Sequence, residues 1–119
     1  MINHIGLRTT QYANLLAFYE AALKPIGYFK KVDFEVAAGL GKNEADFWIG
    51  ADEKGSSNIH LAFTAEARDQ VDAFYAAALA NGGKDNGAPG IREDYSPNYY
   101  AAFVLDPDGN NLEMVCLKG

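Results

Sequence analysis

His4 and His60 are the only two histidines in this chain of 119 residues, and they lie 56 positions apart. Each belongs to a short stretch, residues 2–8 and 58–63, whose alternating side chains are typical of a β-strand. In both stretches the histidine faces away from the most apolar side. Because imidazole is a common metal ligand, a matched pair of strand histidines predicts a shared site, with two structural histidines as the alternative.

A carboxylate should complete such a site, and Glu113 is the best candidate. It follows a turn signal at residues 106–109 and lies within an apolar strand pattern, where an unpaired charge would be costly. The alternative is a surface glutamate on an edge strand. Two imidazoles and one carboxylate suit Fe(II), Mn(II), Ni(II) or Zn(II) and leave positions open for substrate and water. Such a centre is a Lewis acid that binds adjacent oxygens, stabilises an enolate or alkoxide, or, with iron, activates dioxygen.

The turn-rich segment 82–100 is expected to supply substrate-binding residues, because loops on a rigid scaffold often hold them. Arg92 can pair with an anionic group of a small-molecule substrate. Tyr95 or Tyr99 can donate a hydrogen bond or act as an acid near a substrate oxygen, and the alternative for both is packing on the sheet. Trp48 is expected to line the pocket or the core, since indole has one donor and no useful basicity.

The elements that must position these residues repeat within the chain. Residues 4–27 and 60–83 share eight identities in 24 aligned positions, where composition alone gives roughly two. In each copy the first strand is followed by apolar residues at helical spacing, within residues 12–26 and 71–79.

Further strands are predicted after each helix. They cover residues 28–32, 34–40 and 45–50 in the first copy and residues 99–105 and 111–117 in the second. The pattern predicts an α+β fold in which a βαβββ unit occurs twice, at about residues 1–52 and 56–119, within a single domain.

Composition narrows the class of protein. Ten basic against sixteen acidic residues give a net charge of −6, which disfavours nucleic acid as a partner. Cys116 is the single cysteine, so an intrachain disulfide is excluded and a reducing, cytoplasmic setting fits best. The most apolar windows are far too short to cross a bilayer, so a soluble protein without a membrane partner is expected.

Three motifs in this order carry a family resemblance. They are Asn3-His4-Ile5 with Phe18-Tyr19 downstream, the segment Asn-Ile-His-Leu-Ala-Phe at 58–63, and the segment Asp-Pro-Asp-Gly-Asn-Asn-Leu-Glu at 106–113. Over essentially its whole length the chain resembles the vicinal oxygen chelate superfamily, which includes glyoxalase I, fosfomycin and bleomycin resistance proteins and extradiol dioxygenases. The resemblance implies paired βαβββ units that form a cupped mixed sheet around a divalent metal. It also implies that His4, His60 and Glu113 are the metal ligands.

The sequence departs from individual members of this family. Glyoxalase I has a fourth protein ligand at the end of its first unit, where this chain offers Trp48, which argues against that activity. Gly6 replaces the threonine that fosfomycin resistance proteins carry two residues after the first histidine. The expected function is therefore a metal-dependent lyase, isomerase or dioxygenase acting on a small oxygen-rich substrate, with Glu113 as ligand and possible proton carrier.

Two other outcomes stay open at this point. Bleomycin resistance proteins sequester a ligand without catalysis, and by that resemblance the cup would be apolar, free of metal and shared between chains. The repeated units can also pair within one chain or across two. A homodimer is therefore expected, whose site can draw ligands from both subunits.

Overall fold

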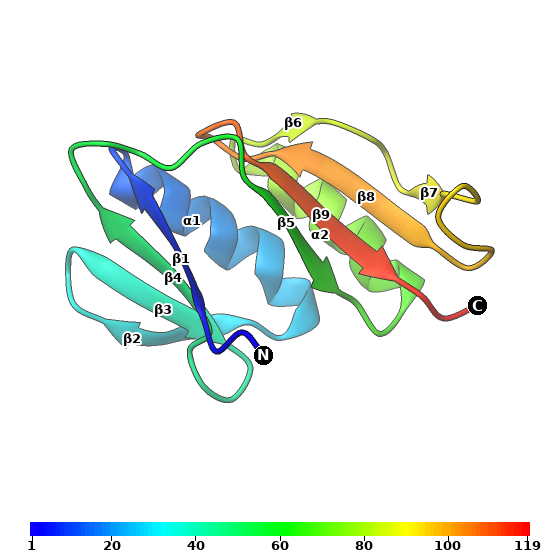
Figure 1. Cartoon of the computed structure of the whole chain (residues 1–119), viewed down its shortest axis with the longest axis horizontal. Helices are drawn as coiled ribbons and strands as arrows, with labels where there is room; N and C mark the ends of the chain where they lie inside the picture. Colours follow the sequence, from blue (N-terminus) through cyan, green and yellow to red (C-terminus); the bar gives the residue numbers. More distant parts are fainter.

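The computed structural model describes residues 1–119 and contains two similar units (Figure 1). The first unit comprises β1 (Ile5–Thr9), α1 (Tyr12–Leu23), the 3₁₀ turn η1 (Lys24–Ile26), β2 (Phe29–Asp33), β3 (Ala37–Gly41) and β4 (Phe47–Ala51). The second comprises β5 (His60–Thr64), α2 (Arg68–Ala80), the short strands β6 (Lys84–Asp85) and β7 (Gly90–Ile91), β8 (Tyr100–Leu105) and β9 (Asn111–Cys116). The predicted α+β fold with a repeated strand, helix and strands is confirmed.

Each unit folds into its own mixed sheet. The strand order is β1-β4-β3-β2 in the first sheet and β5-β9-β8-β6 in the second, where β7 also pairs with β8. In both sheets the first strand runs parallel to the last strand of its unit, and the remaining pairs are antiparallel. Equivalent positions of the two units can therefore be compared strand by strand.

The helices lie on the same side of both sheets and pack against each other (Figure 1). Alternate strand residues such as Leu7, Ile49, Leu112 and Met114 face the helices and are buried there. Burial of these apolar side chains is the main favourable term for the fold. The other face of each sheet carries no helix, and we call it the open face. Neither helix has the length and apolar character needed to cross a membrane.

Several strands begin later than the sequence pattern indicates, β1 and β3 by three residues each. Strand β1 starts at Ile5, so His4 lies just before it and not within it. Strand β3 starts at Ala37, because Glu35 adopts a left-handed backbone conformation with φ 72° and the chain turns there. The alternation of side chains does not reveal at which residue a strand starts to form hydrogen bonds with its neighbour.

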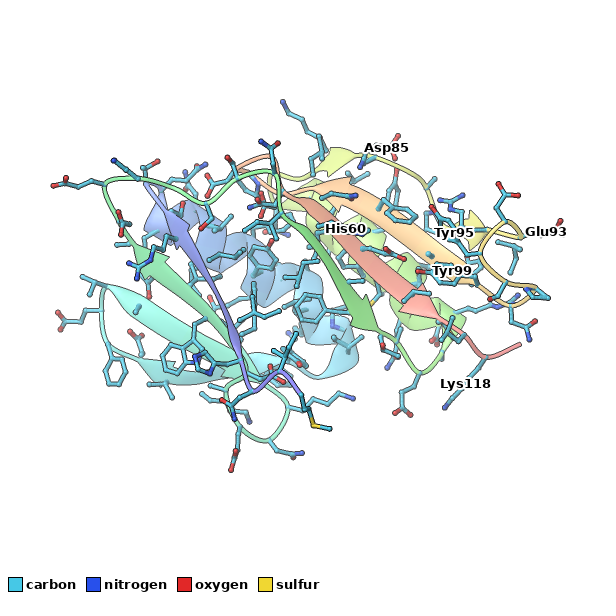
Figure 2. The ribbon with its side chains drawn as sticks, viewed as in Figure 1. His60, Asp85, Glu93, Tyr95, Tyr99 and Lys118 are labelled. Carbon is cyan, nitrogen blue, oxygen red and sulfur yellow. The ribbon has the colours of Figure 1, made fainter.

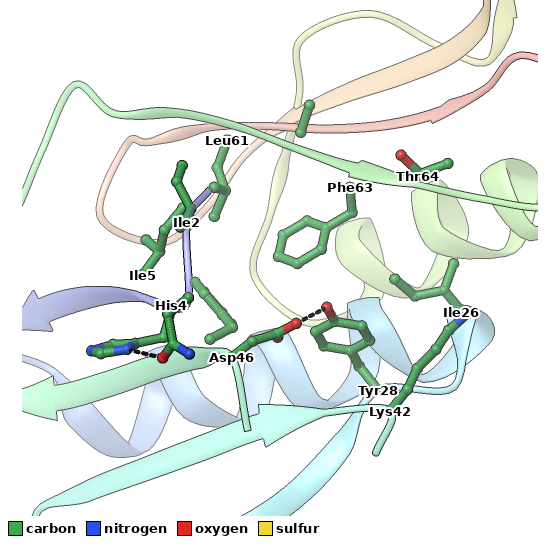
Figure 3. A pocket seen from close by; sticks show the side chains of 13 residues that line it. Ile2, His4, Ile5, Ile26, Tyr28, Lys42, Asp46, Leu61, Phe63 and Thr64 are labelled. Atoms are coloured by element: carbon green, nitrogen blue, oxygen red, sulfur yellow. Dashed lines mark hydrogen bonds between the residues drawn. The ribbon is translucent and has the colours of Figure 1, made fainter. Parts of the chain in front are cut away.

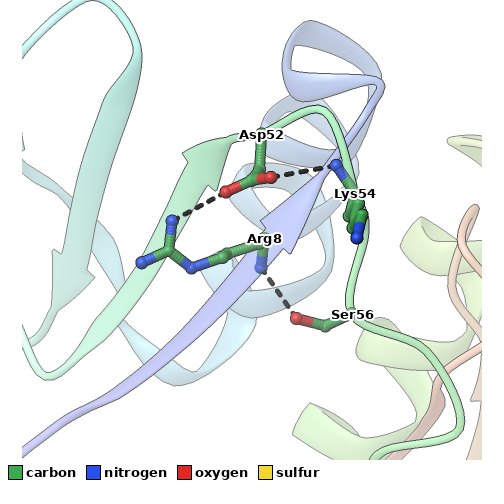
Figure 4. A network of polar contacts seen from close by, with 4 residues as sticks. All are labelled: Arg8, Asp52, Lys54 and Ser56. Atoms are coloured by element: carbon green, nitrogen blue, oxygen red, sulfur yellow. Dashed lines mark hydrogen bonds and ion pairs between the residues drawn. The ribbon is translucent and has the colours of Figure 1, made fainter.

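The segment that joins the two units is held against the first sheet (Figure 4). Arg8 donates from Nη1 to Asp52 Oδ2 at 2.9 Å, and Ser56 Oγ accepts from the Arg8 backbone N–H at 3.1 Å. The backbone N–H of Lys54 and the Arg8 guanidinium, in that order, lower the pKa of Asp52. These contacts fix the path of the chain from β4 towards β5.

A buried polar network at the turn between β8 and β9 also joins the units. Tyr19 on α1 donates from Oη to Asp106 Oδ2 at 2.6 Å, and Asn110 Nδ2 donates to the same oxygen at 2.9 Å. Asp106 Oδ1 accepts from the backbone N–H groups of Asp108 and Asn110. The turn between β8 and β9 thus anchors the second unit to the helix of the first.

Candidate functional site

Three of the predicted site residues meet on the open face of the second sheet. His60 begins β5 and pairs with Asn111, and Glu113 pairs with Ala62 two residues further along the parallel strands. This register lets His60 Nε2 lie 2.9 Å from Glu113 Oε1. Tyr99, which precedes β8, donates from Oη to Glu113 Oε2 at 2.5 Å. We call these three side chains the His60–Glu113–Tyr99 cluster, and Figure 2 shows His60 and Tyr99 over the same sheet.

The carboxylate is buried whereas the imidazole is accessible. The side chain of Glu113 is 3% exposed and that of His60 is 55% exposed. Neither Lys nor Arg pairs with Glu113, so His60 and Tyr99 are its polar partners. A buried carboxylate needs such hydrogen bonds to offset the loss of water. The predicted alternative of a surface glutamate does not describe this residue.

Tyr99 is a hydrogen-bond donor over the neutral pH range. Its bond to Glu113 raises the pKa of the Tyr99 phenol to about 12, with burial and the negative charge of Glu113 acting in the same direction. Tyr95 lies against it with the two ring centres 4.9 Å apart. The Tyr95 side chain is largely exposed and stands at the outer edge of the cluster (Figure 2).

His4 lies apart from the cluster within the chain. Its Nδ1 is 2.8 Å from Asn3 Oδ1, and the residue is exposed. It lines a pocket of about 420 Å³ between the units, together with Tyr28, Asp46 and residues 61–64 of β5 (Figure 3). No group of three His, Cys, Asp or Glu side chains in the chain is placed to hold a metal ion. A single chain therefore brings together two of the three predicted ligands.

The same pocket holds a pair that sequence reasoning missed. Tyr28 donates from Oη to Asp46 Oδ2 at 2.9 Å (Figure 3). Burial first, and then the bond to Asp46, raises the pKa of Tyr28 to about 12. Tyr28 and Asp46 lie outside β2 and β4, and no spacing in the sequence indicates that they meet.

Trp48 occupies the position in the first sheet that Glu113 occupies in the second. Trp48 pairs with Gly6 on β1, two residues after His4, just as Glu113 pairs with Ala62, two residues after His60. The indole stacks on Phe34, with ring centres 6.2 Å apart and planes at 13°. It also lines a pocket of about 360 Å³ on the first unit. Trp48 contributes a pocket wall there and no metal-ligating atom.

Arg92 and Tyr95 line a third pocket, of about 340 Å³, beside the cluster. The Arg92 guanidinium lies over the Phe103 ring at 5.5 Å, and the same ring is 6.3 Å from that of His60. Sequence reasoning missed Phe103, although it pairs with Glu113 across β8 and β9. Side chains alternate between the two faces along residues 99–105 and along β9. This alternation was the signal that could have indicated that Phe103 and Glu113 share a face.

The donors present suit a divalent transition metal in part. An imidazole nitrogen and a carboxylate oxygen from neighbouring strands are adjacent, and they are the ligand types that Fe(II), Mn(II), Ni(II) and Zn(II) accept. Tyr99 donates a hydrogen bond to the carboxylate and so orients it. Residues that do not touch the metal commonly orient its ligands in this way. His60 and Glu113 fit as two ligands, and a complete site needs at least one more from elsewhere.

The fold and the cluster define an α+β protein of paired βαβββ units with an imidazole–carboxylate pair on an open sheet face. Residues 1–114 match the family model of the Glyoxalase/Bleomycin resistance protein/Dioxygenase superfamily, and the chain belongs to this superfamily. The predicted resemblance is thereby confirmed. The superfamily contains enzymes as well as proteins that only bind ligands, and its members generally use divalent metals.

Solved structures show the same fold. A glyoxalase/bleomycin resistance protein from Albidiferax ferrireducens T118 has a TM-score of 0.82 and 27% identity, with 95% of each chain covered. A glyoxalase/bleomycin resistance protein/dioxygenase family enzyme from Burkholderia phytofirmans PsJN has a TM-score of 0.76 and 18% identity, with 98% of each chain covered. A glyoxalase I mutant from Zea mays has a TM-score of 0.68 and 22% identity over 96% of this chain and 45% of that one. No curated protein matches the sequence significantly.

Proposed function

We propose that this protein is a metal-dependent enzyme that acts on a small oxygen-rich substrate at the His60–Glu113–Tyr99 cluster. The observation that carries the proposal is the 2.9 Å contact between His60 Nε2 and the buried Glu113 carboxylate on a face that no helix covers. A His–Glu pair with a purely structural role does not need an accessible imidazole, whereas a pair that binds a metal does. The superfamily membership supports the same reading.

The third ligand is His4 of a second copy of the chain. Within one chain His4 is exposed and separate from the cluster, yet the two units share one topology. A homodimer in which the first sheet of one subunit faces the second sheet of the other would supply His4 to each cluster. Such a two-fold arrangement makes two identical sites, as closed symmetric dimers do.

The side chains of the cluster have separate tasks. When bound, a divalent metal acts as a Lewis acid that stabilises negative charge on substrate oxygens, which serves a lyase, an isomerase or, with iron, a dioxygenase. His60 and Glu113 hold the metal. Tyr99 fixes the orientation of the Glu113 carboxylate and, with its raised pKa, keeps its proton at neutral pH. Tyr95, at the exposed edge, donates a hydrogen bond to the substrate.

A second function, ligand sequestration without turnover, is favoured by a different observation. Trp48 stacks on Phe34 and occupies the position at which an acidic residue would provide a metal ligand on the first sheet. Phe34 and Val36 are 65% and 64% exposed, so the first unit presents an apolar surface beside this stack. In a dimer, that surface would form the wall of a cup suited to a flat apolar ligand.

Metal analysis tests the enzyme proposal. The wild-type protein, purified without a histidine tag, is measured as isolated and after supply of iron, manganese, nickel and zinc, beside His60→Ala and the surface control Glu66→Gln. We expect near-stoichiometric uptake by the wild type and the control, and loss of uptake in His60→Ala. A wild-type protein that takes up none of the four metals would refute the enzyme proposal. Metal binding without turnover of any oxygen-rich substrate would favour sequestration instead.

A further inference from the structure

The pocket beside the cluster has the chemistry of an anion site. Its lining consists of Asn86, Gly87, Arg92, Tyr95, Phe103 and Asn111, and it contains one cation and no carboxylate. The chain as a whole carries a net charge of −6, and no Asp or Glu lies within ion-pair distance of Arg92. A lone guanidinium on an acidic protein is therefore free to pair with a ligand.

The Arg92 guanidinium is held in place without being neutralised. Nη2 donates to the carbonyl oxygen of Ala88 at 2.6 Å, and the group lies over the Phe103 ring at 5.5 Å. Gly87, with φ 145°, allows this approach, because a Cβ there would lie 3.2 Å from Nη2 and 3.1 Å from the Phe103 ring. The remaining N–H donors of the planar group stay available for a carboxylate or phosphate.

The amides of the pocket add neutral donors. Asn86 Nδ2 donates to Asn111 Oδ1 at 3.2 Å, which leaves the Nδ2 of Asn111 without an acceptor in the chain. Asp85, which precedes Asn86, has Oδ1 occupied by the Tyr75 hydroxyl and the Gly87 N–H. Glu93 and Asp94, which follow Arg92, do not line the pocket and form no ion pair with Arg92. Hydrogen bonds from amides and a guanidinium together favour an anion over a neutral group.

Both sides of the pocket lead to the His60–Glu113–Tyr99 cluster. On one side the Phe103 ring lies between Arg92 and His60, at 5.5 and 6.3 Å. On the other side Tyr95 packs on Tyr99, which bonds Glu113. Asn111 pairs directly with His60 across β5 and β9. A ligand seated on Arg92 therefore reaches the cluster without leaving the open face.

We propose that Arg92, Asn86 and Asn111 bind the carboxylate or phosphate group of the substrate, so that the substrate is a small organic anion whose other oxygens reach His60 and Glu113. The substrate role rests on the proposed function, whereas anion binding in the pocket does not. The inference thus narrows the oxygen-rich substrate to one chemical class.

Anion titration of the metal-free protein, followed by nitrogen-15 NMR, tests the inference. Sodium acetate and sodium phosphate are added at constant ionic strength, and the Arg92 Nε–H and Gly87 amide signals are recorded. We expect saturable shifts of both signals, with the tighter anion showing whether the site prefers carboxylate or phosphate. Absence of a saturable shift with both anions would overturn the proposal.

Three variants make the result specific, and the Gly87 amide reports on all of them. Arg92→Gln and Asn86→Asp should each lower the affinity for the anion by about tenfold or more. The first variant removes the cation, and the second adds a negative charge that repels the anion. Arg8→Gln is the matched control, because Arg8 pairs with Asp52 on the other unit, and its anion affinity should equal that of the wild type. Equal affinity in Arg92→Gln and the wild type would also overturn the proposal.

The outcome is separable from that of the proposed function. Metal uptake without anion shifts would leave the enzyme proposal standing and remove the anion site. Anion shifts that depend on Arg92, in a protein that takes up no metal, would support the anion site and refute the enzyme proposal.

Discussion

Trp48 and Glu113 are structural equivalents in the two halves of the molecule, one pairing with Gly6 and the other with Ala62. Each lies beside the first strand of its unit, two residues beyond the position of a histidine. The repeat has therefore kept its backbone while the chemistry of the two open faces has diverged. The second sheet carries the polar cluster and the first an aromatic stack.

Replacing Glu113 by Gln should strongly weaken metal binding with little change in fold. The amide preserves shape but is a poor ligand for a divalent metal, so we expect affinity to fall by about a hundredfold or more. Tyr99→Phe removes only the bond that orients the carboxylate and should cost about tenfold. Titration calorimetry with zinc measures both losses, and Glu66→Gln serves as control. Equal affinities in Tyr99→Phe and Glu113→Gln would contradict the separate roles.

Alkaline titration should show Tyr28 and Tyr99 ionising late. Both pKa values are raised from 10.0 to about 12, so the neutral phenol is favoured in the folded protein. The resulting stabilisation is fully present below pH 10 and is lost as the pH rises from about 10 through about 12. Tyrosinate absorbance in the ultraviolet and urea unfolding at several pH values measure the two effects.

The causes of these two shifts differ, which gives a matched comparison. For Tyr99 the largest cause is the bond to Glu113, and for Tyr28 it is burial. Glu113→Gln should therefore lower the pKa of Tyr99 by more than Asp46→Asn lowers that of Tyr28. The opposite order would show that burial dominates at Tyr99.

Tyr19→Phe should destabilise the protein although Tyr19 is not part of the cluster. Tyr19 is fully buried, and its hydroxyl is one of the donors to the buried Asp106. Loss of that donor leaves a buried carboxylate short of a partner, which typically costs about 1–3 kcal/mol. Tyr75→Phe is the control, because its partner Asp85 is exposed, and it should change stability by less than about 0.5 kcal/mol. Urea unfolding of both variants decides the point.

Periodicity of side chains predicted most of the fold. The alternation in residues 58–63 and the helical spacing in residues 71–79 each report which face is apolar, and burial follows that face in the structure. Self-similarity between the copies then predicted that His4 and His60 are equivalent. It could not reveal where each histidine lies relative to Glu113, because that depends on how the two sheets are placed in space.

The turn at residues 106–110 illustrates the same limit. Its residue types predict a turn, and the structure confirms one. Its second role, as the anchor for Tyr19 of the other unit, arises from a contact across 87 positions in the sequence. Tyr99 likewise meets Glu113 only because β8 and β9 pair in one register. Local patterns carry no record of such long-range hydrogen bonds.

Mixing two inactive variants should restore metal binding if the site is shared between subunits. His4→Ala and Glu113→Gln each remove one ligand from every site of their own homodimer. A mixed dimer, however, has one site with His4 from one subunit and His60 with Glu113 from the other. Random pairing makes half of the dimers mixed, so about a quarter of the wild-type metal should return after subunit exchange.

The control mixture combines His60→Ala with Glu113→Gln. These residues lie 2.9 Å apart in the same chain, so neither site of a mixed dimer is complete and no metal should return. Mass spectrometry of differently labelled subunits verifies that exchange has taken place. Exchange without recovery in the first mixture would refute a site shared between subunits, because the intact His4 of one subunit would then be present with the intact His60 and Glu113 of its partner without binding metal. Recovery in the first mixture alone would assign the ligands of each site to two chains.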